Sequence, residues 1–79
     1  MDARDAVKIL SKYPLVVRMM LRDWPSRYIT ITDIAIRGDF VIKKARTFMY
    51  QLMNDGIIER YQTSFRLTEI FLEAREGLK

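Results

Sequence analysis

Residues 39–56 read DFVIKKARTFMYQLMNDG, a stretch that predicts one helix with two chemically different sides. When the segment is wound at about 100° per residue, its apolar side chains fall on one continuous arc. The arc consists of Val41, Ile42, Ala45, Phe48, Met49, Leu52 and Met53. The opposite side contains no acid and consists of Lys43, Lys44, Arg46, Thr47, Tyr50 and Gln51. We therefore expect the chain to bury one side of this helix and to expose the other.

Both ends of the segment carry residues that are typical of helix boundaries. Asp39 can accept a hydrogen bond from a free backbone N–H at the start of the helix. Gly56 can adopt the left-handed conformation with which many helices end. We expect the helix to occupy residues 40–55.

The size and composition of the chain indicate a single globular domain over residues 1–79. Hydrophobic residues make up 49% and charged residues 30% of the sequence, a balance that predicts a folded protein. The run Leu15-Val16-Val17 stops at Arg18, far short of the roughly 20 apolar residues that cross a bilayer. We expect no membrane span, no secretory signal and a cytoplasmic location.

The residue types that are absent restrict the chemistry. The sequence has no cysteine and no histidine, which excludes disulfides, thiolate or imidazole catalysis and the usual zinc sites. It also lacks a glycine-rich phosphate loop. We expect no catalytic residue, no metal and no cofactor, and therefore not an enzyme. The net charge of +4 favours a polyanionic partner, and the bases concentrate on the outward side of residues 40–55.

Two helices are predicted before this segment. The first covers residues 3–11, with Asp2 and Asp5 near its start. Pro14 suits the first turn of the second, which Pro25 ends after about residue 24. The predicted apolar side of the second helix consists of Leu15, Val16, Met19, Met20 and Trp24, widened by Val17 and Leu21.

The remaining elements are short. Residues 28–30 favour a strand, and Thr30 with Asp33 resembles a capping box that starts a helix over residues 31–37. Gly38-Asp39 forms the turn into the long helix. Residues 57–62 and 65–67 predict a hairpin around Thr63-Ser64. Thr68 can cap a last helix over residues 69–76, which Gly77 closes. The fold class is therefore mainly α with a small β-hairpin, an α+β protein.

Three motifs carry a resemblance to a known superfamily. They are Thr30-Ile-Thr-Asp-Ile-Ala35, then Ala45-x-x-x-Met49-x-x-Leu52-x-x-x-Gly56-Ile-Ile-Glu-Arg60, then Phe65-Arg-Leu-Thr-Glu69. In this order they resemble the winged helix-turn-helix domains of small prokaryotic transcription regulators. The stretch ILSKYP at 9–14, followed by MML at 19–21, is similar to the amino-terminal part of the ArsR- and MarR-like groups. The resemblance implies a three-helix core plus a wing and flanking terminal helices.

The sequence also departs from these groups. Val16 stands where an arginine is usual, and no cysteine or histidine is present for metal sensing as in ArsR-like repressors. We therefore do not expect induction by that route. The scarcity of Asn, Gln and Cys beside abundant Ile and Arg also fits a regulator from a thermophilic archaeon or one of its viruses.

The resemblance implies sequence-specific binding to double-stranded DNA by a transcription regulator, which is nucleoid-associated when bound. The helix over residues 40–55 is expected in the major groove and the hairpin over residues 57–67 as the wing. Three residues are expected to contact base edges: Lys43, Lys44 and Thr47. Arg46 is expected to contact phosphate, and Tyr50 and Gln51 are expected to contact either a base or a phosphate. Wing contacts are expected at Arg60, Gln62, Thr63, Ser64 and Arg66, and phosphate contacts at Thr30 and Thr32.

Other interpretations stay open. A basic helix side is often only solvated, and Arg60 and Arg66 can pair with Glu59 or Glu69. Winged-helix domains also act as protein-interaction modules without direct DNA binding. Related regulators pair about a two-fold axis, and we expect a homodimer through the first and last helices. The predicted contact residues are Ala6, Val7, Leu10, Ile70, Phe71 and Leu78.

Overall fold

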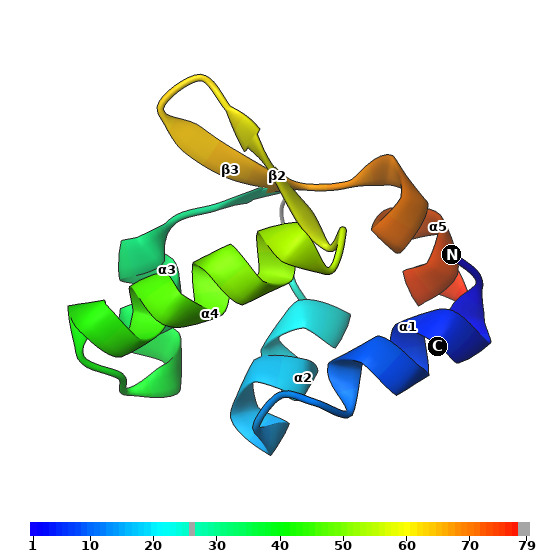
Figure 1. Ribbon diagram of the computed structural model, residues 1–79, viewed down its shortest axis with the longest axis horizontal. Helices are drawn as coiled ribbons and strands as arrows, with labels where there is room; N and C mark the ends of the chain where they lie inside the picture. The colour runs from blue at the N-terminus through cyan, green and yellow to red at the C-terminus, as the bar shows by residue number, and fades with distance from the viewer. Residues whose placement is uncertain (26, 78–79) are drawn as a thin grey trace.

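The computed structural model describes residues 1–25 and 27–77 (Figure 1). Within this part the chain forms five helices and one three-stranded antiparallel sheet, which confirms the predicted α+β class. The elements in chain order are α1 (Ala3–Leu10), α2 (Leu15–Arg22), β1 (Tyr28–Ile29), α3 (Ile31–Gly38), α4 (Ile42–Asn54), β2 (Ile58–Tyr61), β3 (Ser64–Leu67) and α5 (Glu69–Glu76).

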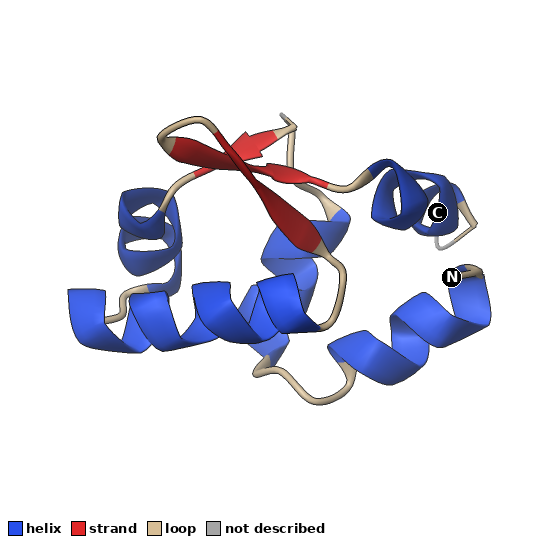
Figure 2. Ribbon diagram, turned by 45° about the horizontal axis from the view of Figure 1, so that its top comes forward, coloured by secondary structure: helices blue, strands red, loops and turns tan. Residues whose placement is uncertain are grey.

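The sheet lies along one side of the helices, with α3 and α4 toward one end of the molecule and α1 and α5 at the other (Figures 1 and 2). The strand order is β1-β3-β2, so β3 is central and pairs with both neighbours in antiparallel fashion. Phe65 pairs with Ile29, and Leu67 pairs with Ile58. The side chains of these four residues are buried and form the inner face of the sheet.

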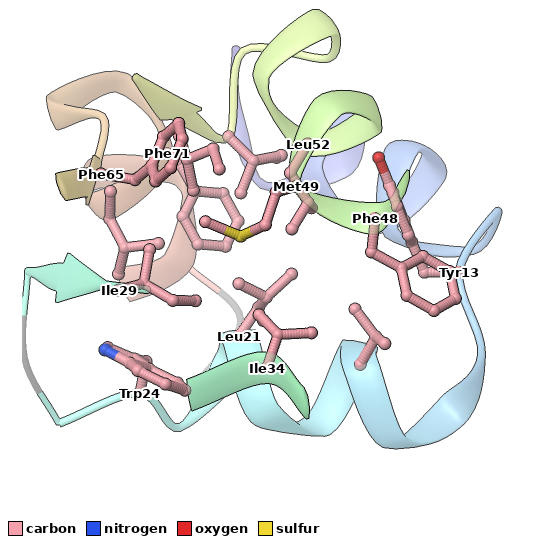
Figure 3. Packing of buried hydrophobic residues seen from close by; sticks show 14 of the residues in the cluster. Tyr13, Leu21, Trp24, Ile29, Ile34, Phe48, Met49, Leu52, Phe65 and Phe71 are labelled. Carbon is pink, nitrogen blue, oxygen red and sulfur yellow. The ribbon is translucent and has the colours of Figure 1, made fainter. Parts of the chain in front are cut away.

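The core draws side chains from α2, α3, α4, α5 and the sheet (Figure 3). Leu21, Ile34, Met49, Leu52 and Phe71 are almost completely shielded from solvent. Burial of apolar area at about 25 cal/mol per Å² is the main force that fixes these elements together. The buried side of α4 consists of Ala45, Phe48, Met49 and Leu52, as predicted for the centre of its apolar arc.

The turn between α3 and α4 differs from the prediction at Asp39. Asp39 does not cap the start of α4; it ends α3 in the left-handed conformation, with φ 55°. The backbone N–H of Phe40 donates to the carbonyl of Ala35 at 2.9 Å, and that of Asp39 donates to Ile36 at 3.4 Å. These two bonds satisfy carbonyls at the end of α3. Helix α4 therefore begins later than predicted, after Val41, which gives it no side-chain cap.

The buried side of α2 also differs from the prediction. Val17 and Leu21 face the core, whereas Leu15, Val16 and Met19 are exposed. The apolar stripe of this helix is wide enough for either orientation, and the packing of α2 on α3 selects the side with Val17 and Leu21. Trp24 is buried beyond the end of the helix, where its indole N–H donates to the carbonyl of Tyr28 at 2.8 Å.

The hairpin tip is one residue earlier than predicted. Ser64 pairs with Tyr61 inside the sheet, so the tip consists of Gln62 and Thr63, and Gln62 takes a positive φ of 54°. The last helix matches its predicted bounds, and the hydroxyl of Thr68 accepts the predicted bond from the N–H of Phe71.

Helices α1 and α5 pack against each other within one chain. Three of the predicted dimer-contact residues, Ala6, Leu10 and Phe71, are therefore buried in the chain's own core, while Val7 and Ile70 stay exposed. Leu78 lies outside the described residues. Across residues 1–25 and 27–77, no helix combines the length and the apolarity that a bilayer crossing requires.

Candidate nucleic-acid interface

The outward side of α4 is the most basic exposed surface on any single helix of the described chain. All six residues predicted there are exposed. They are Lys43, Lys44, Arg46, Thr47, Tyr50 and Gln51. No acid occurs anywhere in α4, so its positive field is not neutralised from within the helix. The opposite side is held in the core, which fixes the direction in which these side chains project.

Two residues predicted to be buried extend this exposed surface. Val41 is 73% and Ile42 is 47% exposed, although both fall on the apolar arc of the sequence. Val41 is exposed because it precedes the helix, so its predicted position on the helical wheel does not apply. Ile42 is the first residue of the helix and keeps its place on the flank of the apolar arc, but the core cluster does not extend to this end of α4.

Internal contacts orient two of the polar side chains. The hydroxyl of Thr47 donates to the carbonyl of Lys43 at 3.1 Å, one turn earlier in the helix. The ammonium nitrogen of Lys44 lies 5.5 Å from the ring centroid of Phe48, on one flank of α4. Lys43 and Arg46 make no such contact with the rest of the described chain, and their charges stay available to a ligand.

The acid that follows α4 is engaged elsewhere. The Asp55 carboxylate accepts a hydrogen bond from the Tyr13 hydroxyl at 2.7 Å and from the Lys12 ammonium at 3.0 Å. Burial by itself would raise the pKa of Asp55, but the bonds from Tyr13 and Lys12 and the charge of Lys12 outweigh it and lower that pKa. Burial, followed by the bond to Asp55, raises the pKa of the Tyr13 hydroxyl. This cluster links the α1–α2 loop to the end of α4 without adding free negative charge to the interface.

The sheet separates the two arginines that were predicted to contact DNA from the hairpin. Side chains alternate between the faces of a strand, so Arg60, opposite Phe65, lies on the inner face, and Arg66 lies on the outer face. Arg66 donates to Glu59 at 2.7 Å and lies 4.7 Å from the ring of Tyr61. Its pairing with Glu59 matches the alternative left open by the sequence. Arg60 lies 5.6 Å from the ring of Phe65, and Thr63 is exposed at the tip.

The predicted threonines at the start of α3 have different surroundings. The hydroxyl of Thr30 accepts a bond from the N–H of Asp33 at 3.0 Å, and the Asp33 carboxylate accepts one from the N–H of Thr30. This capping box confirms the predicted local structure. The carboxylate of Asp33 also places a negative charge in the first turn of α3, which opposes a phosphate there. Thr32 is exposed.

Comparison with known proteins gives no relative. No protein-family model matches the chain, and neither a curated protein nor a solved structure is significantly similar to it. The function must therefore be inferred from the geometry above. The structure exposes the six polar residues of α4, with Val41 exposed just before the helix and Ile42 exposed on its flank, and it leaves Arg66 paired on the outer face of the sheet.

Proposed function

We propose that this chain is a winged helix-turn-helix domain that binds double-stranded DNA in a sequence-specific manner, as a transcription regulator. The observation that carries the proposal is the acid-free, exposed side of α4 with Lys43, Lys44 and Arg46. Phosphate groups attract such a surface, and an α-helix fits the major groove of B-form DNA.

The order of the elements supports the proposed fold. Helix α3 joins α4 through Asp39, Phe40 and Val41, and the β2–β3 hairpin follows α4 directly. The ring of Phe40 lies 5.0 Å from that of Phe48, which anchors the turn on the buried side of α4. In a winged helix-turn-helix domain, α4 is the recognition helix and the hairpin is the wing.

The roles of the residues follow their exposure and partners. Lys43 has the position and the free charge to reach base edges, and Arg46 is placed to reach phosphate on the flank of the helix. Lys44, Tyr50 and Gln51 add further polar contacts. In the wing, Arg60 and Thr63 are better placed than Arg66, which would first have to leave Glu59.

The test is selection of bound duplexes from a random pool, followed by titration of the enriched duplex. We expect enrichment of a defined motif, and an affinity that falls steeply with salt, at a log–log slope of about −0.9 for each phosphate contacted. Changing Lys43, Lys44 and Thr47 together to alanine should abolish the motif preference.

A matched control removes the same charge from another helix. Arg4 and Lys8 are exposed on α1, at the other end of the molecule from α3. The Arg4→Ala, Lys8→Ala variant should keep the motif and lose at most a few-fold in affinity, whereas Lys43→Ala, Lys44→Ala should lose more than about tenfold. Equal losses in both variants, or the same motif from the triple variant, would contradict the proposed role of α4. Failure to enrich any duplex would favour a protein-interaction module.

A homodimer belongs to this proposal, because two copies place two recognition helices on successive major grooves. Of the contact residues predicted on α1, Val7 is exposed and can touch a second copy, whereas Ala6 and Leu10 are buried. Next to Val7, Leu15 and Met19 on α2 border a groove of about 300 Å³.

A further inference from the structure

The first turn of α4 combines exposed aliphatic side chains with positive charge. Val41 and Ile42 are 73% and 47% exposed, and Lys43 and Lys44 follow them directly. Arg46 lies one turn after Ile42, on the same side of the helix. Two adjacent aliphatic residues at the start of an otherwise polar helix side offer an apolar contact within reach of the charges.

Thr47 adds an apolar group on the outward side of α4, about 140° around the helix from Ile42. Its hydroxyl donates to the carbonyl of Lys43, so the helix backbone already uses the hydrogen of that group. The oxygen can still accept a hydrogen bond, and the γ-methyl offers an apolar contact beside it. Thr47 is exposed and lies one turn after Lys43, on the outward side of α4.

One feature of duplex DNA combines an apolar group with surrounding negative charge. The 5-methyl group of thymine is the only apolar substituent that a standard base presents in the major groove, and phosphates flank it on both sides. Side chains from the amino-terminal part of a helix reach base edges in this groove. The aliphatic residues and the basic residues of α4 thus complement methyl groups and phosphates respectively.

We infer that Val41, Ile42 and the γ-methyl of Thr47 read thymine methyl groups, so that the bound site contains A·T pairs where the first turn of α4 enters the groove. This inference rests on the proposed function and specifies its substrate. It assigns part of the discrimination to apolar groups that make no hydrogen bond with a base, beside the base contacts proposed for Lys43, while Arg46 supplies affinity through charge.

The test uses the duplex enriched from a random pool, synthesised once with thymidine and once with deoxyuridine at every thymidine position. Uracil pairs as thymine does and lacks only the methyl group. We expect the deoxyuridine duplex to bind the unmodified protein about fourfold more weakly for each contacted methyl, the effect of burying one such group. The Val41→Ala, Ile42→Ala variant should bind the thymidine duplex more weakly and should discriminate less between the two duplexes.

Ile36→Ala is the matched control, because Ile36 is 74% exposed on α3 and belongs neither to the predicted DNA contacts nor to the predicted dimer contacts. This variant should discriminate as the unmodified protein does. Circular dichroism should show equal melting temperatures for all three proteins, since the changed residues are surface residues.

The outcomes separate the inference from the proposed function. The protein could bind its motif tightly but with equal affinity for both duplexes. That result would overturn the inference alone and would indicate that Val41 and Ile42 contact a protein partner instead. The same holds for undiminished discrimination in the Val41→Ala, Ile42→Ala variant, or for an enriched motif without A·T pairs. If no duplex is enriched, both the proposed function and the inference are wrong.

Discussion

Arg75 is the residue whose role differs most from its appearance in the sequence. It is only 9% exposed, and one guanidinium nitrogen donates to the carbonyls of Leu21 and Trp24 at 3.1 and 3.0 Å. These carbonyls belong to the end of α2 and the segment just after it, so a charge on α5 satisfies backbone acceptors of a distant helix. In the sequence Arg75 lies among Glu73, Glu76 and other charged residues and looks like a solvated side chain.

Replacement of Arg75 by alanine should lower the free energy of unfolding by about 2–4 kcal/mol, because a buried acceptor left unsatisfied costs about 1–3 kcal/mol. Urea denaturation measures this difference. Arg46→Ala is the control, an exposed arginine whose loss should change stability by less than about 0.5 kcal/mol. Similar unfolding free energies for the two variants would show that the Arg75 contacts contribute little.

Tyr13 contributes stability that depends on pH. Tyr13→Phe removes the hydrogen bond to the Asp55 carboxylate and should cost about 1.5–3 kcal/mol at pH 7, typical of a bond to a charged group. The pKa of Tyr13 is raised in the folded state above its ordinary value of 10.0, so its contribution is complete below pH 10 and is lost at higher pH.

The measurement compares unfolding of the unmodified protein and Tyr13→Phe at pH 7 and near pH 11. The stability difference between them should shrink at the higher pH, because Tyr13 ionises in the unfolded chain and not in the folded one. A difference that stays constant or grows would mean that the folded protein does not hold Tyr13 neutral.

At the scale of elements, α3 and α4 end with the same backbone motif, although only one of these ends was predicted. Gly56 takes φ 79°, and its N–H and that of Ile57 donate to the carbonyls of Met53 and Leu52. Asp39 plays the corresponding part after α3, one residue beyond the glycine that the sequence offers. Local preference favours glycine at such a position, but the packing of Phe40 on α4 sets which residue occupies it.

The two left-handed positions should respond to substitution with opposite signs. Gly56→Ala should destabilise the protein by about 1–2 kcal/mol, the cost of a left-handed conformation for an ordinary residue. A Cβ at Gly56 meets no atom within 4 Å, so crowding adds nothing. Asp39→Gly should change stability by less than about 1 kcal/mol, in the stabilising direction, since the strain on Asp39 is relieved and chain entropy offsets part of the gain.

Thermal unfolding followed by circular dichroism compares both variants with the unmodified protein. Gly56→Asn serves as an internal control, because asparagine tolerates the left-handed region better than alanine and should lose less. A Gly56→Ala protein that melts at the same temperature as the unmodified one would argue against the left-handed end of α4.

At the scale of the whole molecule, α5 joins parts of the chain that are far apart in sequence. The hydroxyl of Thr68 donates to the carbonyl of Gly56 at the end of α4 and accepts from the N–H of Phe71. Arg75 ties the other end of α5 to α2. With both ends held and α1 packed against it, α5 completes the core of one chain, and within the described chain Ile70 is the one large hydrophobic residue that it leaves exposed.

The proposed homodimer should therefore form through the exposed side of α1 and α2. Light scattering at micromolar concentration should give twice the mass of a single chain, and Val7→Lys with Met19→Lys should give a monomer. Both side chains border the groove, which Arg18 and Arg22 also line, so the added positive charges would be buried among like charges. Ile36→Lys changes an exposed residue on α3 and should leave the dimer intact. A monomer from the unmodified protein would remove this part of the proposal.

The sequence alone determined the existence and order of the elements, because their signals are local. Proline at residues 14 and 25, the threonine caps at residues 30 and 68, and Gly56 act within one or two helical turns. The same holds for the polar side of α4, whose residues are all exposed as predicted.

Only the tertiary structure decided which side of α2 is buried, where α4 begins and that Arg75 is inside. The apolar stripe on α2 is so wide that the sequence does not specify which side is buried. The packing of neighbouring elements determines it. The start of α4 follows from Phe40 packing on Phe48, which holds Val41 and Ile42 at the surface. Packing, unlike local conformational preference, depends on contacts between residues that are distant in sequence.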